Sequence, residues 1–365
     1  MRLLDWRDFD RRDRIVAWDA LAERASEPNP FYESWYLLPS LRALAKDTRD
    51  LHILALEVDG RLEGVLPIQR SRNYYGYPIP HWRNWVHANC FLGLPLVARG
   101  HERAFWHGLL HHCDQAGGLG LFLHLAGLPA QGPMHQALAD VLAEQARPAA
   151  TVQRSERAML ASGVTTQQYW QAALPQKKRK ELRRQHRRLA EHGNLTVERL
   201  CDYTDVAKWT REFLALESRG WKGKAGSALD NDPATSELFT FAVAGAAARG
   251  RLERLALRLD GKPIAMLASF LTAPGAYSYK TAFDEDWARY SPGVLLQQEN
   301  LAMLTREEIE WVDSCAAANH PMIDHVWRER RTIASHSIAI GGALRRALFA
   351  QLARRETGQT PRGIQ

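Results

Sequence analysis

At 365 residues, the chain is more than twice as long as a typical domain of roughly 150 residues, which predicts two domains or one duplicated domain. It is 45% apolar and 24% charged, and no stretch approaches the ~18 uninterrupted apolar residues of a membrane helix. Its N-terminus has acidic residues where a signal peptide would be apolar, so we expect a cytoplasmic protein without a signal peptide or membrane span. The net charge of +7 is carried by residues 177–188, without which the chain is neutral.

The first half of the chain predicts a helix, a hairpin and then a strand, a helix and a strand. Residues 51–70 form two apolar runs around Asp59-Gly60, a dipeptide favoured where both central residues of a turn need positive φ. The other predicted elements are helices at 31–47 and 101–115 and strands at 84–97 and 120–125.

The same order of elements recurs in the second half. Residues 252–270 place Asp260-Gly261 between similar apolar runs, 201 residues after the first hairpin. A duplicated α/β unit, with a mixed sheet and helices on its faces, is the simplest explanation. We place the boundary near residue 150, which gives domains 1–150 and 151–365. The remaining predicted elements of the second domain are helices at 203–220 and 291–304 and strands at 275–285 and 309–315.

The segment "KKRKELRRQHRR", residues 177–188, has eight Lys and Arg against one Glu. Such a segment is either a solvated helix face or a surface that binds anions, because like charges at helical spacing repel one another. Nucleic acid, an acidic carrier protein and coenzyme phosphates are all suitable partners. The residues that we expect to form this anion patch are Lys180, Arg183, Arg184 and Arg187.

The stretch "YSPGVLLQQ" has the signals of a helix start. Ser291 stands at the N-cap and Pro292 at the first helical position. Gly293 is not explained by these signals, because glycine costs about 1 kcal/mol in a helix relative to alanine. A glycine in the first turn lets an anion approach free backbone N–H groups at the positive end of the helix dipole.

In its context, the segment Tyr290–Leu295 resembles the pyrophosphate loop of the Gcn5-related N-acetyltransferase (GNAT) fold, which runs roughly Gln/Arg-x-x-Gly-x-Gly/Ala. It departs from that loop at the first position, Tyr, and at the last, Leu. The blocks 179–193, 213–229, 277–297 and 313–331 are similar to the bacterial CelD/BcsL acetyltransferase group, which shares a tandem architecture with the FemAB aminoacyltransferases.

The resemblance implies a mixed-sheet α/β fold with tandem GNAT-like domains and acyl transfer from a thioester, usually acyl-CoA, to an amine or hydroxyl. Only the second half has the glycine turn, so we expect residues 1–150 to be a degenerate domain that shapes the acceptor cleft. The expected cofactor-binding residues are Tyr290, Ser291, Gly293, Val294 and Lys280.

Acyl transfer needs a base for the attacking amine and donors for the developing oxyanion. His320 and Asp313 are the candidate bases because the segment around them runs from a strand end into a loop, and Glu217 is a rival. Trp221, Lys222 and Tyr279 are candidate substrate-binding residues. Lys280 suits a coenzyme phosphate or a salt bridge with a neighbouring aspartate.

Other chemistries have little support in the sequence. His107 and His111 have metal-ligand spacing but lack further ligands, so an ordinary amphipathic helix is expected there, and no metal. The four scattered cysteines give no disulfide framework or zinc knuckle. The chain has neither a G-x-S-x-G elbow nor a P-loop.

The leading hypothesis is an N-acyltransferase that takes its acyl group from acyl-CoA or an acyl carrier protein. Its acceptor would be an amine of a small molecule, peptide or saccharide. One alternative is a FemAB-like transferase that uses aminoacyl-tRNA, with the basic segment on the RNA backbone. A second alternative is a degenerate, non-catalytic binding module.

Overall fold

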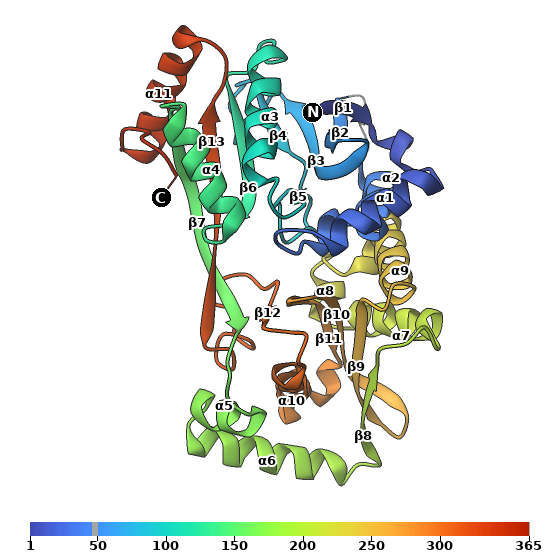
Figure 1. Ribbon diagram of the computed structural model, residues 1–365. Helices are drawn as coiled ribbons and strands as arrows, with labels where there is room; N and C mark the ends of the chain where they lie inside the picture. Colours follow the sequence, from blue (N-terminus) through green and yellow to red (C-terminus); the bar gives the residue numbers. More distant parts are fainter. Residues whose placement is uncertain (46–49, 365) are drawn as a thin grey trace. The chain divides into compact units, whose positions relative to one another are not determined.

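The computed structural model describes residues 1–45 and 50–364 and divides into two compact units (Figure 1). The first unit contains Met1–Ser155 and Thr332–Gln365, and the second contains Glu156–Arg331. We expected the second domain to be 151–365, but its last segment packs with the first unit. The final residues of the first predicted helix, 46 and 47, lie outside the described residues.

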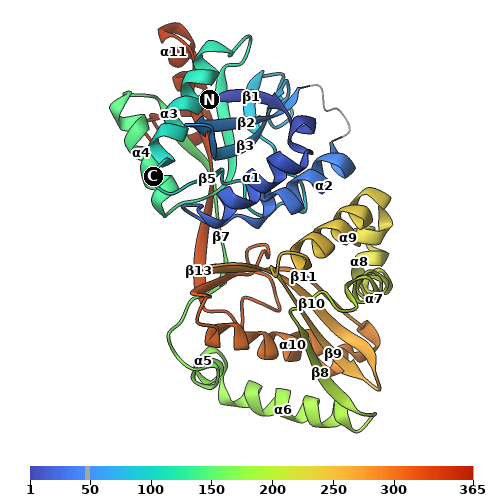
Figure 2. The same cartoon turned by 45° about the vertical axis from the view of Figure 1, so that its right-hand side comes forward.

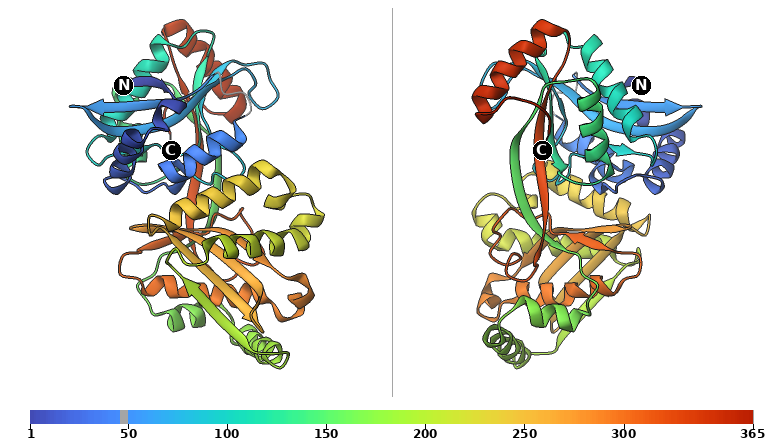
Figure 3. Two further views of the ribbon diagram at one scale, coloured as in Figure 1. Left: turned by 90° about the vertical axis from the view of Figure 1, so that its right-hand side faces the viewer. Right: turned by 60° about the vertical axis from the view of Figure 1, so that its left-hand side comes forward.

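The first unit is a mixed sheet with the strand order β1-β2-β3-β4-β6-β13-β7, and β5 pairs with β3. Strand β13 pairs antiparallel with β6, which is why the C-terminal segment belongs here. Helix α11, the red helix of Figure 3, packs Phe349 against Phe122 of β6. The elements are β1 Arg2–Asp5, η1 Trp6–Phe9, α1 Arg12–Glu23, η2 Pro30–Tyr32, α2 Ser34–Leu44, β2 Leu51–Val58, β3 Arg61–Ser71, β4 His81–Asn84, β5 Leu96–Val97, α3 Glu102–Gln115, β6 Phe122–Pro129, α4 Pro133–Glu144, β7 Ala149–Leu160, β13 Glu329–Ala339 and α11 Ala343–Thr357.

The second unit has the strand order β12-β11-β10-β9-β8, and the end of β7 pairs with β12. Helices α7 and α9 cover one face of this sheet, and α6 and α10 cover the other (Figure 2). The elements are α5 Thr166–Ala173, α6 Gln176–Ala190, β8 Leu195–Leu200, α7 Val206–Arg219, α8 Trp221–Lys224, η3 Leu229–Asn231, α9 Pro233–Ala247, β9 Leu252–Leu259, β10 Lys262–Thr272, β11 Gly275–Phe283, η4 Glu285–Tyr290, α10 Pro292–Asn300, η5 Leu301–Thr305 and β12 Trp311–Asp313.

The two hairpins repeat the same backbone geometry, as their sequences predict. Asp59-Gly60 has φ values of 50° and 76°, and Asp260-Gly261 has 48° and 77°. Each hairpin also has a register shift three residues beyond its turn, at Glu63 and at Ile264. These two positions are again separated by the same offset as the turns. The recurrence of both the turn and the bulge supports an internal duplication.

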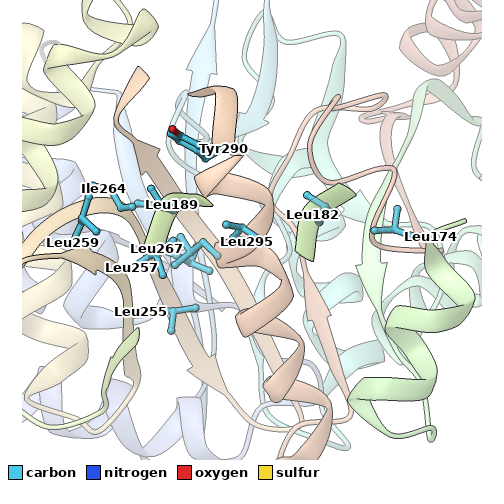
Figure 4. Close-up of a cluster of buried hydrophobic side chains, with 12 residues drawn as sticks. Leu174, Leu182, Leu189, Leu255, Leu257, Leu259, Ile264, Leu267, Tyr290 and Leu295 are labelled. Atoms are coloured by element: carbon cyan, nitrogen blue, oxygen red, sulfur yellow. The ribbon is translucent and has the colours of Figure 1, made fainter. Parts of the chain in front are cut away.

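Helix α6 is held on the second unit by few apolar side chains. Leu182 and Leu189 are its buried residues, and they are one heptad apart on the same helix face. Figure 4 shows them in a cluster with Leu257 of β9 and Leu295 of α10. The rest of α6 is polar, so most of its basic side chains point to solvent. Among the described residues, no helix has the length and apolar character that crossing a membrane requires.

Two buried histidines of the first unit remain neutral in the folded state. His124 Nδ1 lies 3.1 Å from Ser337 Oγ, and His336 Nδ1 lies 3.1 Å from Thr151 Oγ1. Burial lowers the pKa of His124 to about 4, with help from His81 and Arg83. Burial also lowers the pKa of His336 to about 3, with help from the charges of His135, Arg154 and His124.

These histidines predict a loss of stability in acid. In the unfolded chain these histidines bind protons at about pH 6.5, whereas in the folded protein they stay neutral to a lower pH. Their contribution to the unfolding free energy is therefore complete above pH 6.5 and is lost as the pH falls towards 4 and 3. We expect the unfolding free energy to fall by about 1.4 kcal/mol per pH unit for each histidine. Urea titrations between pH 7.5 and 4.5 measure this. His336→Gln should flatten the slope and the exposed His111→Gln should not; equal slopes in both variants would contradict the assignment.

Candidate active site

In the second unit, the parallel strands β11 and β12 are paired over three residues only and then separate. Gly275, Ala276 and Tyr277 of β11 pair with β12, which ends at Asp313, whereas β11 continues to Phe283. No strand pairs with residues 278–283 on this side within the described part of the chain. We call this the open edge of β11. An unpaired strand edge presents backbone donors and acceptors to an extended ligand.

Asp313 lies fully buried at the point where the strands part. Its Oδ2 accepts hydrogen bonds from Arg157 Nη2 at 2.7 Å and Arg331 Nη1 at 3.0 Å, and its Oδ1 accepts one from the Cys315 N–H at 2.9 Å. The Arg331 guanidinium also lies over the Trp311 ring, 4.5 Å from its centroid. Burial lowers the pKa of Arg331, but Tyr277 and Asp313 outweigh it and raise the pKa overall.

These contacts favour an anchoring role for Asp313 rather than the expected role as a base. Both carboxylate oxygens are already engaged, and no hydrogen bond joins Asp313 to His320 among the described residues. Arg157 and Arg331 were not among the site residues expected from the sequence. No local pattern identifies them, because they meet Asp313 across 156 and 18 residues of chain.

Glu217 fixes a turn against the open edge. It is buried at the end of α7, where it accepts hydrogen bonds from Lys222 Nζ at 2.6 Å and from the Leu229 N–H at 2.8 Å. Lys222 Nζ donates a second hydrogen bond to the Thr281 carbonyl of the open edge, at 3.0 Å. Gly223 is required here because a Cβ at this position would lie 1.8 Å from the Ser218 carbonyl oxygen. Glu217 and Lys222 therefore lie in one ion pair beside β11.

Lys280 and His320 share the electrostatic field of Lys222. Burial is the main cause that lowers the pKa of Lys280 to about 8; the charge of Lys222 adds to this shift, and Glu217 opposes it. Burial also lowers the pKa of His320; Asp324 opposes this and Lys222 adds to it. The His320 Nδ1 accepts a hydrogen bond from the Met322 N–H at 3.4 Å. A lowered pKa keeps His320 neutral at neutral pH, as a general base requires.

The start of α10 differs from the expected cap. Ser291 is at the N-cap but has φ 54° and ψ 48°, and its side chain makes no capping hydrogen bond. Its carbonyl accepts from the N–H groups of Val294 and Leu295, each at 3.0 Å. A Cβ at Gly293 would lie 2.5 Å from Met322 Sδ, so the thioether covers this glycine. An anion at this helix start would have to displace Met322.

Two aromatic residues that we expected in the site are buried, and their roles there stay predictions. Tyr290 is buried, and its hydroxyl lies 2.7 Å from His192 Nε2. Tyr279 is also buried and stacks on Phe270, with ring centroids 4.6 Å apart. Both assignments were drawn from local sequence, which does not reveal these long-range partners. Trp221, in contrast, is 53% exposed beside Lys222 and stays a candidate substrate contact.

The four residues of the predicted anion patch share one hollow of about 730 Å³. The hollow lies between α6, the β8 and β9 strands and α10. Of the segment where the cofactor phosphates were expected, only Leu295 lines it, and Ser291 and Gly293 do not. Its lining residues are Lys180, Leu182, Arg183, Arg184, His186, Arg187, Val197, Leu257, Leu295, Gln298 and Glu299.

Comparisons with known proteins identify the fold. A family model described as "Acetyltransferase (GNAT) domain" matches residues 176–320, and no curated protein matches the chain by sequence. The structure is similar to FemX, with a TM-score of 0.58 and 10% identity over 93% of this chain and 98% of FemX. The structure is also similar to a conserved protein of unknown function from Bacteroides thetaiotaomicron VPI-5482. The TM-score is 0.57 and the identity 8%, over 89% of this chain and 97% of that one.

A third similar structure is the C-terminal domain of an Agrobacterium fabrum protein named for lysylphosphatidylglycerol synthetase. Its TM-score is 0.54 and its identity 14%, over 93% of this chain and 96% of that one. At such identities the likeness concerns the fold. The predicted FemAB-like, tandem GNAT fold is confirmed, while the narrower resemblance to the CelD/BcsL group stays a prediction.

The anchoring role of Asp313 predicts a stability defect. Asp313→Asn should lower the unfolding free energy by about 3–5 kcal/mol, because it leaves two buried guanidinium groups without their counter-charge. Denaturant titration of this variant and of the exposed control Glu307→Gln measures the difference. A variant of normal stability that has lost transfer activity would instead identify Asp313 as a base.

Proposed function

We propose that this chain, which has an acyltransferase fold of the GNAT type, transfers an acyl group from a thioester to an amine at the open edge of β11. The observation that carries the proposal is the separation of β11 from β12 beside a partly buried cluster of titratable side chains. That cluster comprises Glu217, Lys222, Lys280 and His320. The match of residues 176–320 to an acetyltransferase domain supports the same reaction class.

The open edge suits a donor that carries amides in an extended chain. The pantetheine arm, which acyl-CoA and acyl carrier proteins share, has this character and would hydrogen-bond to β11 as an added strand does. Lys280 and Lys222 supply positive charge beside the edge. The start of α10 fits a phosphate less well, because Met322 covers Gly293. We therefore assign donor recognition mainly to β11.

The chemistry follows from the protonation states of the side chains. The acceptor amine attacks the thioester carbonyl, the new C–N bond forms, and the C–S bond breaks to release a thiolate, which takes a proton from solvent and leaves as the thiol. His320 takes the proton that the amine loses, since its lowered pKa keeps it neutral. Backbone N–H groups and the Lys222 ammonium at the edge stabilise the negative charge on the carbonyl oxygen. Glu217 holds Lys222 in position.

An aminoacyl ester donor is the alternative that the likeness to FemX and the basic face of α6 favour. The same attack by an amine would then break a C–O bond and release a hydroxyl. The two donors differ in their leaving group, so a direct assay separates them. A non-catalytic module would release neither.

The donor assay offers acetyl-CoA, long-chain acyl-CoA, acyl carrier protein and aminoacyl-tRNA in turn with a mixture of amines. We expect thiol release from at least one thioester, because the open edge matches their common arm. Free thiol is measured with a chromogenic disulfide. Deacylation of aminoacyl-tRNA without any thiol release would favour the alternative donor, and no turnover at all would favour the non-catalytic module.

The role of His320 predicts a pH effect as well as a rate effect. His320→Gln should lower kcat about 10²- to 10⁴-fold and remove the acid limb of the pH–rate profile. Because burial lowers the pKa of His320, that limb should lie below the ordinary histidine value of about 6.5. The control His325→Gln changes an exposed histidine of the same loop. A rate loss with an unchanged pH profile would contradict the assignment to His320.

A further inference from the structure

The hollow beside α6 is strongly cationic. Its lining residues include four Lys and Arg side chains against the one carboxylate of Glu299. None of the four, Lys180, Arg183, Arg184 and Arg187, is in an ion pair with an acidic side chain within the described residues. Two other cations of the unit are paired, Arg199 with Glu253 and Arg258 with Glu198. The four unpaired charges thus form a surface that favours an anionic partner.

The cations follow one face of a single helix. Lys180, Arg183, Arg184 and Arg187 are spaced by three or four residues, so they lie on the same side of α6. From the first to the last they extend over about 10 Å, which is about two helical turns. Like charges at this spacing destabilise an isolated helix. Leu182 and Leu189 hold α6 in place despite this repulsion, because both are buried in the core (Figure 4).

The rest of the lining decides which kind of anion fits. The apolar floor of the hollow consists of Val197 on β8, which is 46% exposed, and of three leucines that are buried. The leucines are Leu182, Leu257 and Leu295. No Trp, Tyr or Phe is among the lining residues. Single-stranded nucleic acid is held by stacking of its bases on aromatic rings, and an A-form duplex offers phosphates and hydroxyls rather than apolar surface. An acidic amphipathic protein helix has both the charge and the apolar stripe that this lining needs.

We propose that this hollow is the docking site for an acidic helix of a carrier protein that delivers the thioester. This inference rests on the proposed function, because it names the macromolecule that brings the donor. Acidic side chains of the partner helix pair with the four cations, and its apolar stripe contacts the exposed Val197. Docking and transfer then use different residues, since the hollow excludes β11 and His320.

The test measures binding without turnover. A fluorescently labelled bacterial holo-acyl carrier protein is titrated with the full chain, and anisotropy gives the affinity. Arg183→Gln combined with Arg187→Gln should weaken binding about tenfold or more. The matched control, Lys177→Gln with Arg188→Gln, removes the same charge from exposed positions of α6 that do not line the hollow, and should change the affinity less than about threefold.

A second pair of variants tests the apolar floor. Val197→Glu should weaken carrier binding, whereas Val164→Glu, at another exposed valine of the same unit, should have little effect. Equal losses in the two charge variants would reduce the effect to net charge and overturn the proposal. A 12-base-pair RNA duplex is tested in the same way. If it bound more tightly than the carrier and lost affinity with the Arg183 and Arg187 changes, the proposal would be overturned in favour of nucleic acid.

The failure of this inference is distinguishable from that of the proposed function. Thiol release from acetyl-CoA by the unchanged protein needs no carrier and tests transfer alone. If transfer is active but carrier binding does not depend on the hollow, the proposed function stands and the docking site is refuted. If carrier binding depends on the hollow but no donor is used, the docking site stands and the proposed function is refuted.

Discussion

The buried contact between Asp313 and two arginines fixes the point at which the parallel pairing of β11 and β12 ends. Arg157 comes from β7, Arg331 from β13 and Asp313 from β12, so one carboxylate joins three strands where β12 stops. A buried carboxylate with two guanidinium partners cannot move without leaving a charge unpaired. The open edge of β11 depends on this fixed point, since the chain leaves the sheet directly after it.

The electrostatics of the open edge follow from burial and from a second, partly buried ion pair. Glu217 holds Lys222 against the Thr281 carbonyl. Burial lowers the pKa of both Lys280 and His320, and the charge of Lys222 adds to each shift. Together these effects keep His320 neutral, which is the state that accepts a proton. The hollow beside α6 differs in kind, because its cations are exposed and their charge acts on a partner rather than on a reacting group.

The sequence predicted the repeated order of elements because local signals determine it, but the strand expected at 84–97 was wrong, since only Asn84, Leu96 and Val97 of that range are in strands. The Asp-Gly dipeptides adopt the expected positive φ values, and the basic segment forms a helix with its cations on one face. Contacts between distant residues were not predictable in this way. Tyr290 meets His192 across 98 residues, and β13 pairs with β6 rather than staying with its own half of the chain. Ser291 lacks its expected side-chain cap because its backbone is left-handed.

Hydrogen–deuterium exchange with an unreactive thioether analogue of acyl-CoA tests the central claim most directly. If the donor binds along the open edge, backbone amides within residues 278–283 should exchange more slowly in its presence, because an added strand occupies their hydrogen-bonding positions. Unchanged exchange across β11, with protection confined to α6 or another element, would contradict the account.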